Sequence, residues 1–148
     1  MEPMQPTVRL AAYTGKGDIF NAAIRRRTGS NMSHCELVID GVWYSASLRD
    51  RGVRRKHVDP KPGEWEYQTL PWADAFEIIK WFDENEEVQY GIGDLLLQLF
   101  RLDADAPGEV CSTACAAALD FPRAYKYNPK TLWEACLQRT RAWEAARA

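Results

Sequence analysis

The sequence predicts an α+β protein whose antiparallel sheet of about five strands packs against helices. Apart from one helix-like segment, strand-like runs dominate the chain up to residue 70, and helical spacing of apolar residues replaces them from Pro71 onward. Asp40 and Gly41 join two of these runs and form a strong signal for a two-residue hairpin turn. Strands followed by helices are typical of folds in which helices cover one face of an antiparallel sheet.

The strand-like segments alternate apolar and polar residues and are bounded by turn-forming residues. We expect strands over residues 7–14, in the two arms of a hairpin over 30–47, over 52–58 and over 65–70. Between the first strand and the hairpin, residues 17–29 space Phe20, Ala23 and Ile24 as a helix does and end on a glycine.

Four further helices are expected after the strands, over residues 73–86, 90–102, 111–121 and 129–148. The chain of 148 residues has no internal repeat and no linker-like stretch. It is long enough to bury a core of its own. We therefore expect a single domain over residues 1–148.

The hairpin brings a histidine and a glutamate together. Residues two apart on a strand share a face, so His34 and Glu36 lie on the same side. Pairing across the turn sets Ser45 opposite Glu36 and Ser47 opposite His34. The other face of the hairpin is apolar and suited to the core; it carries Cys35, Leu37, Ile39, Val42, Tyr44 and Ala46. Taken alone, the strand also fits a structural histidine with an incidental glutamate neighbour.

Cys111 is the second informative residue, because the segment "APGEVCSTACAAALDF" starts a helix at or just after it. A thiol in the first turn of a helix lies near unpaired backbone N–H groups and the positive end of the helix dipole, which stabilise the thiolate. Free cysteines are also often plain core residues, and Cys115, one turn further, is expected to be one. A cysteine, a histidine and a polar residue that orients the histidine are the three components of a thiol hydrolase.

Composition narrows the possible partners. A formal net charge of −2 gives no general attraction to nucleic acid or to an anionic membrane. The basic runs at residues 25–27 and 49–56 are expected to be solvated faces, and no apolar stretch is long enough to span a membrane. The four cysteines are expected to be reduced. No cofactor and no metal is expected, since a set of His34, Cys35, Cys111 and Cys115 matches no zinc motif.

The start of the chain lacks the charged and apolar regions of a secretory signal. We therefore expect a protein that is cytoplasmic on synthesis. Release during lysis, or delivery by a phage or secretion apparatus, would then be needed to bring it to a cell wall.

At these residues the sequence resembles a family. "SHCELVIDGVWYSASLRDRGVR" followed much later by "VCSTACAAALDF" is similar to the circularly permuted branch of the NlpC-type papain-like cysteine peptidases, above all to small members from phages and prophages. The resemblance covers roughly residues 8–137 and implies a permuted papain-like fold. It implies Cys111 as nucleophile and His34 as general base. Relatives often place the orienting carboxylate or amide on the strand after the histidine, where this sequence has serines. Glu36, the nearest ionisable side chain on the histidine strand itself, is therefore the candidate orienting residue. Ser45 and Ser47 stand as alternative orienting or substrate-binding residues.

The resemblance also implies a substrate class, an amide bond in peptidoglycan peptides, and hence cell-wall degradation. Two alternatives stay open. A lipid acyltransferase or thioesterase would use the same cysteine and histidine, and a phage structural or assembly protein would keep the fold without activity. For any of the enzymes, we expect the Cys111 helix to cover the sheet face that carries His34, with the sulfur near a ring nitrogen of that histidine.

Overall fold

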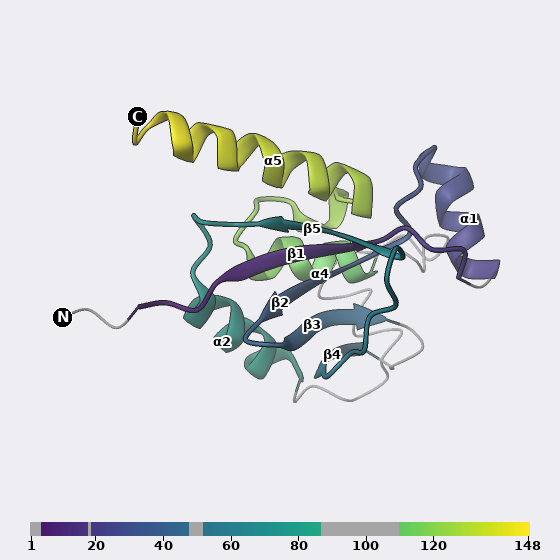
Figure 1. The fold of residues 1–148 in the computed structure, drawn as a ribbon. Coiled ribbons are helices and arrows are strands. Elements are labelled where there is room, and N and C mark those ends of the chain that lie inside the picture. Colours follow the sequence, from purple (N-terminus) through teal and green to yellow (C-terminus); the bar gives the residue numbers. More distant parts are fainter. Residues whose placement is uncertain (1–3, 18, 48–51, 87–109) are drawn as a thin grey trace.

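The computed structural model describes residues 4–17, 19–47, 52–86 and 110–148 (Figure 1). The first half contains strands and one helix: β1 (Val8–Tyr13), α1 (Ile19–Thr28), β2 (His34–Ile39), β3 (Val42–Ser47), β4 (Gly52–Lys56) and β5 (Trp65–Thr69). The second half is helical, with α2 (Ala75–Glu86), α4 (Val110–Ala118), the short 3₁₀ helix η2 (Ala124–Lys126) and α5 (Pro129–Ala145). The α+β class and the antiparallel sheet are confirmed; the helix expected over 90–102 lies outside the described residues.

The five strands form one sheet in the order β4-β3-β2-β1-β5, with every neighbouring pair antiparallel. The hairpin turn is as predicted, because Asp40 and Gly41 both have positive φ, 50° and 75°. Its register is also as predicted, with Ile39 opposite Val42 and Val38 opposite Trp43. The sequence fixes this register because one face of the hairpin must be apolar.

The helices bury one face of the sheet. Figure 1 shows α4 running behind the strands and α5 lying beside β5. The main core joins α2, α4 and α5 to apolar residues of β1, β2 and β3, which include Leu10, Cys35, Leu37, Tyr44 and Ala46. The apolar hairpin face is therefore the core face, as its pattern predicted.

The other face carries a separate aromatic cluster. Trp43 packs edge-on against Trp65, with 4.9 Å between ring centroids, and Trp65 packs in the same way against Tyr13. The connection from β4 to β5 joins the two edges of the sheet, and its Val58 packs on this cluster. His34 borders the cluster, since its ring lies 6.3 Å from that of Trp65.

The predicted side for the cysteine helix is wrong. Side chains alternate between the two faces of the sheet, and those of Glu36, Val38 and Trp43 lie on the aromatic face. α4 packs on the opposite face, against Cys35 and its apolar neighbours. The physical reason is burial: the apolar face excludes more water than the face that carries His34 and Glu36. His34 can still meet α4 because it is the first residue of β2 and lies at the end of the strand.

The ends of the later helices follow capping rules. α4 stops at Ala118, earlier than expected, because Asp120 adopts a left-handed φ of 62° and the amides of Asp120 and Phe121 bond back to Ala117 and Ala116. α5 starts where expected, since Asn128 and Thr131 form a reciprocal capping box before the helix. No helix among the described residues is long and apolar enough to cross a membrane.

Candidate active site

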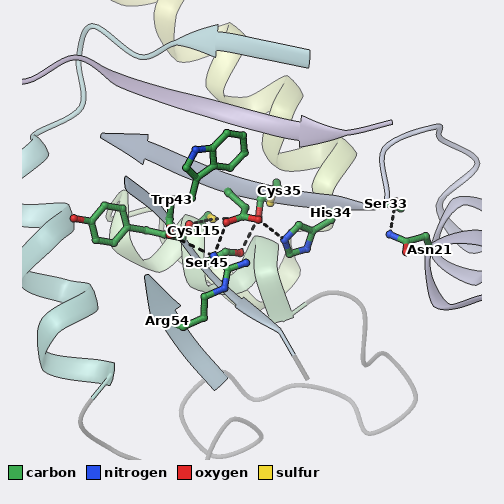
Figure 2. A network of polar contacts seen from close by, with 10 residues as sticks. Asn21, Ser33, His34, Cys35, Trp43, Ser45, Arg54 and Cys115 are labelled. Carbon is green, nitrogen blue, oxygen red and sulfur yellow. Dashed lines mark hydrogen bonds and ion pairs between the residues drawn. The ribbon is translucent and has the colours of Figure 1, made fainter. Parts of the chain in front are cut away.

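Contacts with β1 and α1 hold the backbone at His34 in place. It pairs with Tyr13 across β1 and β2, and the amide of Ser33 donates to the Tyr13 carbonyl at 3.1 Å. The side chain of Asn21 on α1 donates to the Ser33 hydroxyl at 2.8 Å, which ties α1 to the start of β2 (Figure 2). The imidazole, 21% exposed, therefore has a defined position at the end of the strand.

Glu36 is the polar partner of this imidazole. Its Oε2 lies 3.1 Å from His34 Nε2, and its other oxygen, Oε1, accepts from Arg54 Nη1 at 2.5 Å. Figure 2 draws both contacts, with His34 and Arg54 approaching the same carboxylate. Only 3% of the Glu36 side chain is exposed. Burial alone would raise the pKa of Glu36, but hydrogen bonds from His34 and Arg54, together with their charges, lower it to about 2.

Arg54 is a residue that the sequence reasoning missed. The basic run at residues 49–56 was expected to be a solvated face, yet Arg54 is buried and bonded to Glu36. Arg55 fits the expectation better, since its exposed side chain pairs with Asp83 and Glu86. One signal could have found Arg54: once β4 is paired with β3, Arg54 lies opposite Ser45, on the face that carries Glu36.

Cys111 is the second residue of α4, as expected for a thiol in the first turn of a helix. Its side chain is buried, with 2% exposed. A hydrogen bond from the Cys35 thiol lowers the pKa of Cys111, burial opposes this, and the charge and hydrogen bond of His34 lower it further. The pKa of Cys111 therefore lies well below its ordinary value, which favours the thiolate.

The pKa of His34 shifts in the opposite direction, upward. Burial would lower the pKa of His34, but the charge of Cys111 and hydrogen bonds to Cys111 and Glu36 raise it to about 10. Cys111 and His34 are thus favoured as a thiolate and imidazolium pair. Since Nε2 is engaged by Glu36, Nδ1 is the ring nitrogen left to exchange a proton with the thiol.

Cys35 is a second residue that sequence reasoning missed. It was expected to be a core residue, and it is fully buried in the core. It also donates a hydrogen bond to Cys111, and this raises the pKa of Cys35, so Cys35 remains a thiol beside the thiolate. The sequence carried no signal for this contact, because it depends on α4 packing against the apolar face of β2.

Ser45 does not fit its expected role of contacting a substrate. Its side chain is fully buried, and its hydroxyl donates to the carbonyl of Cys35 at 2.7 Å. Ser45 therefore supports the backbone of β2 beside the site. Ser47 is the last residue of β3 and lies partly exposed opposite Gly52. His57, the other histidine of the chain, is exposed beyond the end of β4.

The remaining thiols lie in the core, as expected. Cys115 is buried one turn after Cys111, and its sulfur lies 3.9 Å from the Cys35 carbonyl oxygen. Burial raises the pKa of Cys136 to about 12. Within the described part of the chain, no three His, Cys, Asp or Glu side chains gather as a metal site would require.

A groove of about 410 Å³ lies away from this cluster. It is lined by residues of α2, by the segment at the end of α4 and by Arg139 of α5. Cys111 lies at the start of α4, so the groove and the thiol are at opposite ends of the helix. The groove is therefore separate from the candidate site.

The arrangement has the components of nucleophilic catalysis. Three groups are linked in series: the Cys111 thiolate at the start of α4, the His34 imidazolium beside it, and the buried Glu36 carboxylate on the far ring nitrogen. The first-turn amides of α4 have no carbonyl partners within the helix and can stabilise an oxyanion.

No family model matches the chain, and no curated protein and no solved structure matches it either.

Proposed function

We propose that the protein is a cysteine hydrolase that cleaves an amide bond. The observation that supports this most directly is the linked series from Cys111 through His34 to Glu36, in which each neighbour stabilises the charge needed for attack. A purely structural protein has no need of a buried thiolate beside an imidazolium, because burying charge costs free energy.

In the proposed mechanism, the Cys111 thiolate attacks the carbonyl carbon of the substrate, and backbone amides at the start of α4 stabilise the oxyanion. His34 then donates its proton to the leaving amine, and an acyl thioester remains on Cys111. A water molecule, deprotonated by the neutral His34, attacks this thioester, so that the carboxylic acid product leaves and the Cys111 thiolate is restored beside the imidazolium. Glu36 keeps the ring of His34 in the required orientation throughout.

We propose peptidoglycan peptides as the substrate class. This step depends on the sequence resemblance to the permuted NlpC-type peptidases, in which the histidine strand also precedes the cysteine helix. The order of β2 and α4 along the chain is compatible with that branch. The expected papain-like fold and the role of a cell-wall endopeptidase or amidase are part of the same proposal.

The direct test is incubation of the protein with purified peptidoglycan, followed by mass analysis of the released fragments. We expect new peptide fragments with the wild type and none with Cys111→Ala. The exposed histidine offers a matched control, since His57→Ala should cleave like the wild type. Cleavage that persists in Cys111→Ala would exclude the proposed nucleophile.

A second candidate function is acyl transfer or hydrolysis on lipids or thioesters. One observation favours it: the partly exposed rings of Tyr13 and Trp65 lie beside His34 and present apolar surface there. The chemistry is the same, because both reactions pass through an acyl thioester on Cys111. A parallel assay on a long-chain acyl thioester would separate the two. Turnover of the thioester without any release of peptides would favour the lipid substrate.

A further inference from the structure

We propose that Arg54 is a positioning residue of the site, which holds the Glu36 carboxylate so that one of its oxygens faces His34 Nε2 at every stage of the reaction. The proposal depends on the proposed function, in which His34 cycles between charged and neutral forms. It extends the series by one residue, to Cys111, His34, Glu36 and Arg54.

The geometry separates the two oxygens of Glu36. Arg54 Nη1 donates to Oε1, and Oε2 is the oxygen directed at the imidazole. The same guanidinium nitrogen also donates to the carbonyl of Trp43 at 3.3 Å. Because Trp43 lies on β3, this second contact fixes the guanidinium across the strand between β2 and β4. Arg54 is therefore anchored, with 10% of its side chain exposed, and can hold the carboxylate in one rotamer.

The charges explain why a permanent cation is needed. Glu36 is buried, and an isolated buried carboxylate tends to take up a proton. While His34 is charged, it helps to keep Glu36 ionised. Once His34 has protonated the leaving amine it is neutral, and that help is lost. Arg54 cannot lose its proton in a protein, so it keeps Glu36 an acceptor for the Nε2 proton during this stage.

The four groups also balance in charge. Before attack, the thiolate and the imidazolium compensate each other, and Glu36 compensates Arg54. In the acyl enzyme, the sulfur and the imidazole are both neutral, and the pair of Glu36 and Arg54 is unchanged. The buried cluster therefore has no net charge in either state, which avoids the cost of an uncompensated buried ion.

The chain provides a matched control on the same strand. Arg55 is the next residue of β4, and its side chain, 45% exposed, points to the opposite face, where it pairs with Asp83 and Glu86. Removal of either arginine deletes one positive charge and breaks ion pairs. Only Arg54 contacts the carboxylate that contacts His34.

The test compares Arg54→Met, Arg54→Lys and Arg55→Met with the wild type. The first measurement needs no substrate: the ring N–H signal of His34 by proton NMR, which a hydrogen bond to a carboxylate shifts downfield and protects from exchange. We expect the wild type and Arg55→Met to keep this signal, Arg54→Met to lose it, and Arg54→Lys to recover it in part. A folded Arg54→Met protein with the wild-type signal would overturn the proposal.

The second measurement is turnover on a cleaved substrate. Arg54 does not touch the substrate, so we expect Arg54→Met to lower kcat by about tenfold or more with little change in KM, as for other residues that orient a catalytic group. A rise in KM with unchanged kcat would contradict a positioning role. If no substrate is cleaved even by the wild type, the proposed function fails while the NMR comparison still decides the role of Arg54.

A double-variant comparison covers the case in which Arg54→Met does not fold. Glu36→Gln and Glu36→Gln/Arg54→Met differ only in the arginine, and removing both charges avoids leaving Glu36 unpaired. If Arg54 acts through Glu36, the two proteins should alkylate Cys111 with iodoacetamide at the same rate across pH. A further tenfold loss in the double variant would show that Arg54 acts by another route and would overturn the proposal.

Discussion

His34 and Glu36 lie two residues apart on β2, with 3.1 Å between Nε2 and Oε2. This contact joins neighbours on one face of a strand, so the backbone itself holds the two side chains together. A local pair of this kind needs no distant loop to be in place before the imidazole is oriented. The remaining parts of the site, Cys111 and Arg54, arrive from other elements of the fold.

The first prediction concerns the charge on Glu36. Glu36→Gln keeps the shape of the side chain but removes the anion that stabilises the imidazolium, so the pKa of His34 should fall and turnover should drop at least about tenfold. The fold should persist, although the variant leaves Arg54 without its carboxylate and should lower the free energy of unfolding by about 3 kcal/mol. Turnover and denaturant titration measure the two effects separately.

Ser47→Ala is the control for this prediction, because Ser47 was, with Ser45, an alternative orienting residue and lies partly exposed at the end of β3. It should leave turnover within about twofold of the wild type, because Glu36 already contacts the far ring nitrogen of His34. Full activity in Glu36→Gln together with a large loss in Ser47→Ala would reverse the two assignments.

The hairpin and its polar pair could be predicted from the sequence because local rules determine them. Asp40 and Gly41 fix the turn, and alternation fixes which residues share a face. The start of α5 was predictable for the same reason, since Asn128 and Pro129 form a local capping signal. The end of α4 was missed because aspartate, at Asp120, takes the left-handed position that glycine normally occupies.

The non-local parts of the site were not predictable in this way. The strand order β4-β3-β2-β1-β5 brings Arg54 level with Glu36, and no short-range pattern encodes that order. The side covered by α4 was predicted wrongly because the prediction placed the helix on the face of His34 in order to bring Cys111 near it. Hydrophobic burial decides the side, and the contact between Cys35 and Cys111 follows from it.

The second prediction is a plateau in stability against pH. His34 has a folded pKa of about 10 against 6.5, so its contribution is complete below 6.5 and is lost as pH rises through 10. Cys111 is shifted down from 9.0, so its contribution is complete above 9.0 and declines as pH falls below it. Between 6.5 and 9.0 the two slopes cancel wherever Cys111 is ionised in the folded protein, because the folded pair and the unfolded pair then each hold one proton.

Glu36 adds a loss of stability at acidic pH. Its folded pKa of about 2 against 4.5 means that its contribution is present above 4.5 and is lost as pH falls towards 2. Denaturant titrations of the wild type and of His34→Gln/Cys111→Ser, compared across pH, isolate the pair. Their difference should be flat from 6.5 to 9.0 and fall on both sides. A difference that keeps rising through this range would contradict the thiolate and imidazolium assignment.

The third prediction uses a buried hydroxyl on α4. Thr113 is fully buried, and within the described part of the chain its Oγ1 has no hydrogen-bond partner. Thr113→Val keeps the shape and removes the unpaired group, so it should raise the free energy of unfolding by about 1 kcal/mol. Thr131→Val is the matched control: it removes a hydroxyl that bonds the Asn128 amide at 2.9 Å and should lower stability by a similar amount. Destabilisation by Thr113→Val would mean that the hydroxyl has a partner.

The last prediction concerns which thiol reacts. All four cysteines are buried, so differences in exposure do not decide which thiol reacts first. The charge on the sulfur decides it instead. Cys111 is held as a thiolate by His34 and Cys35, whereas hydrogen bonding to Cys111 raises the pKa of Cys35, and burial raises that of Cys136. At mildly acidic pH, iodoacetamide should therefore label Cys111 first, and His34→Ala should remove much of this preference by deleting the cation. His57→Ala is the control and should label like the wild type, because this histidine is exposed away from the thiol. Mass mapping of the labelled peptides measures the rate at each cysteine. Labelling of Cys136 at the rate of Cys111 would mean that local opening, rather than thiolate character, controls the reaction. The nucleophile would then have to be reassigned.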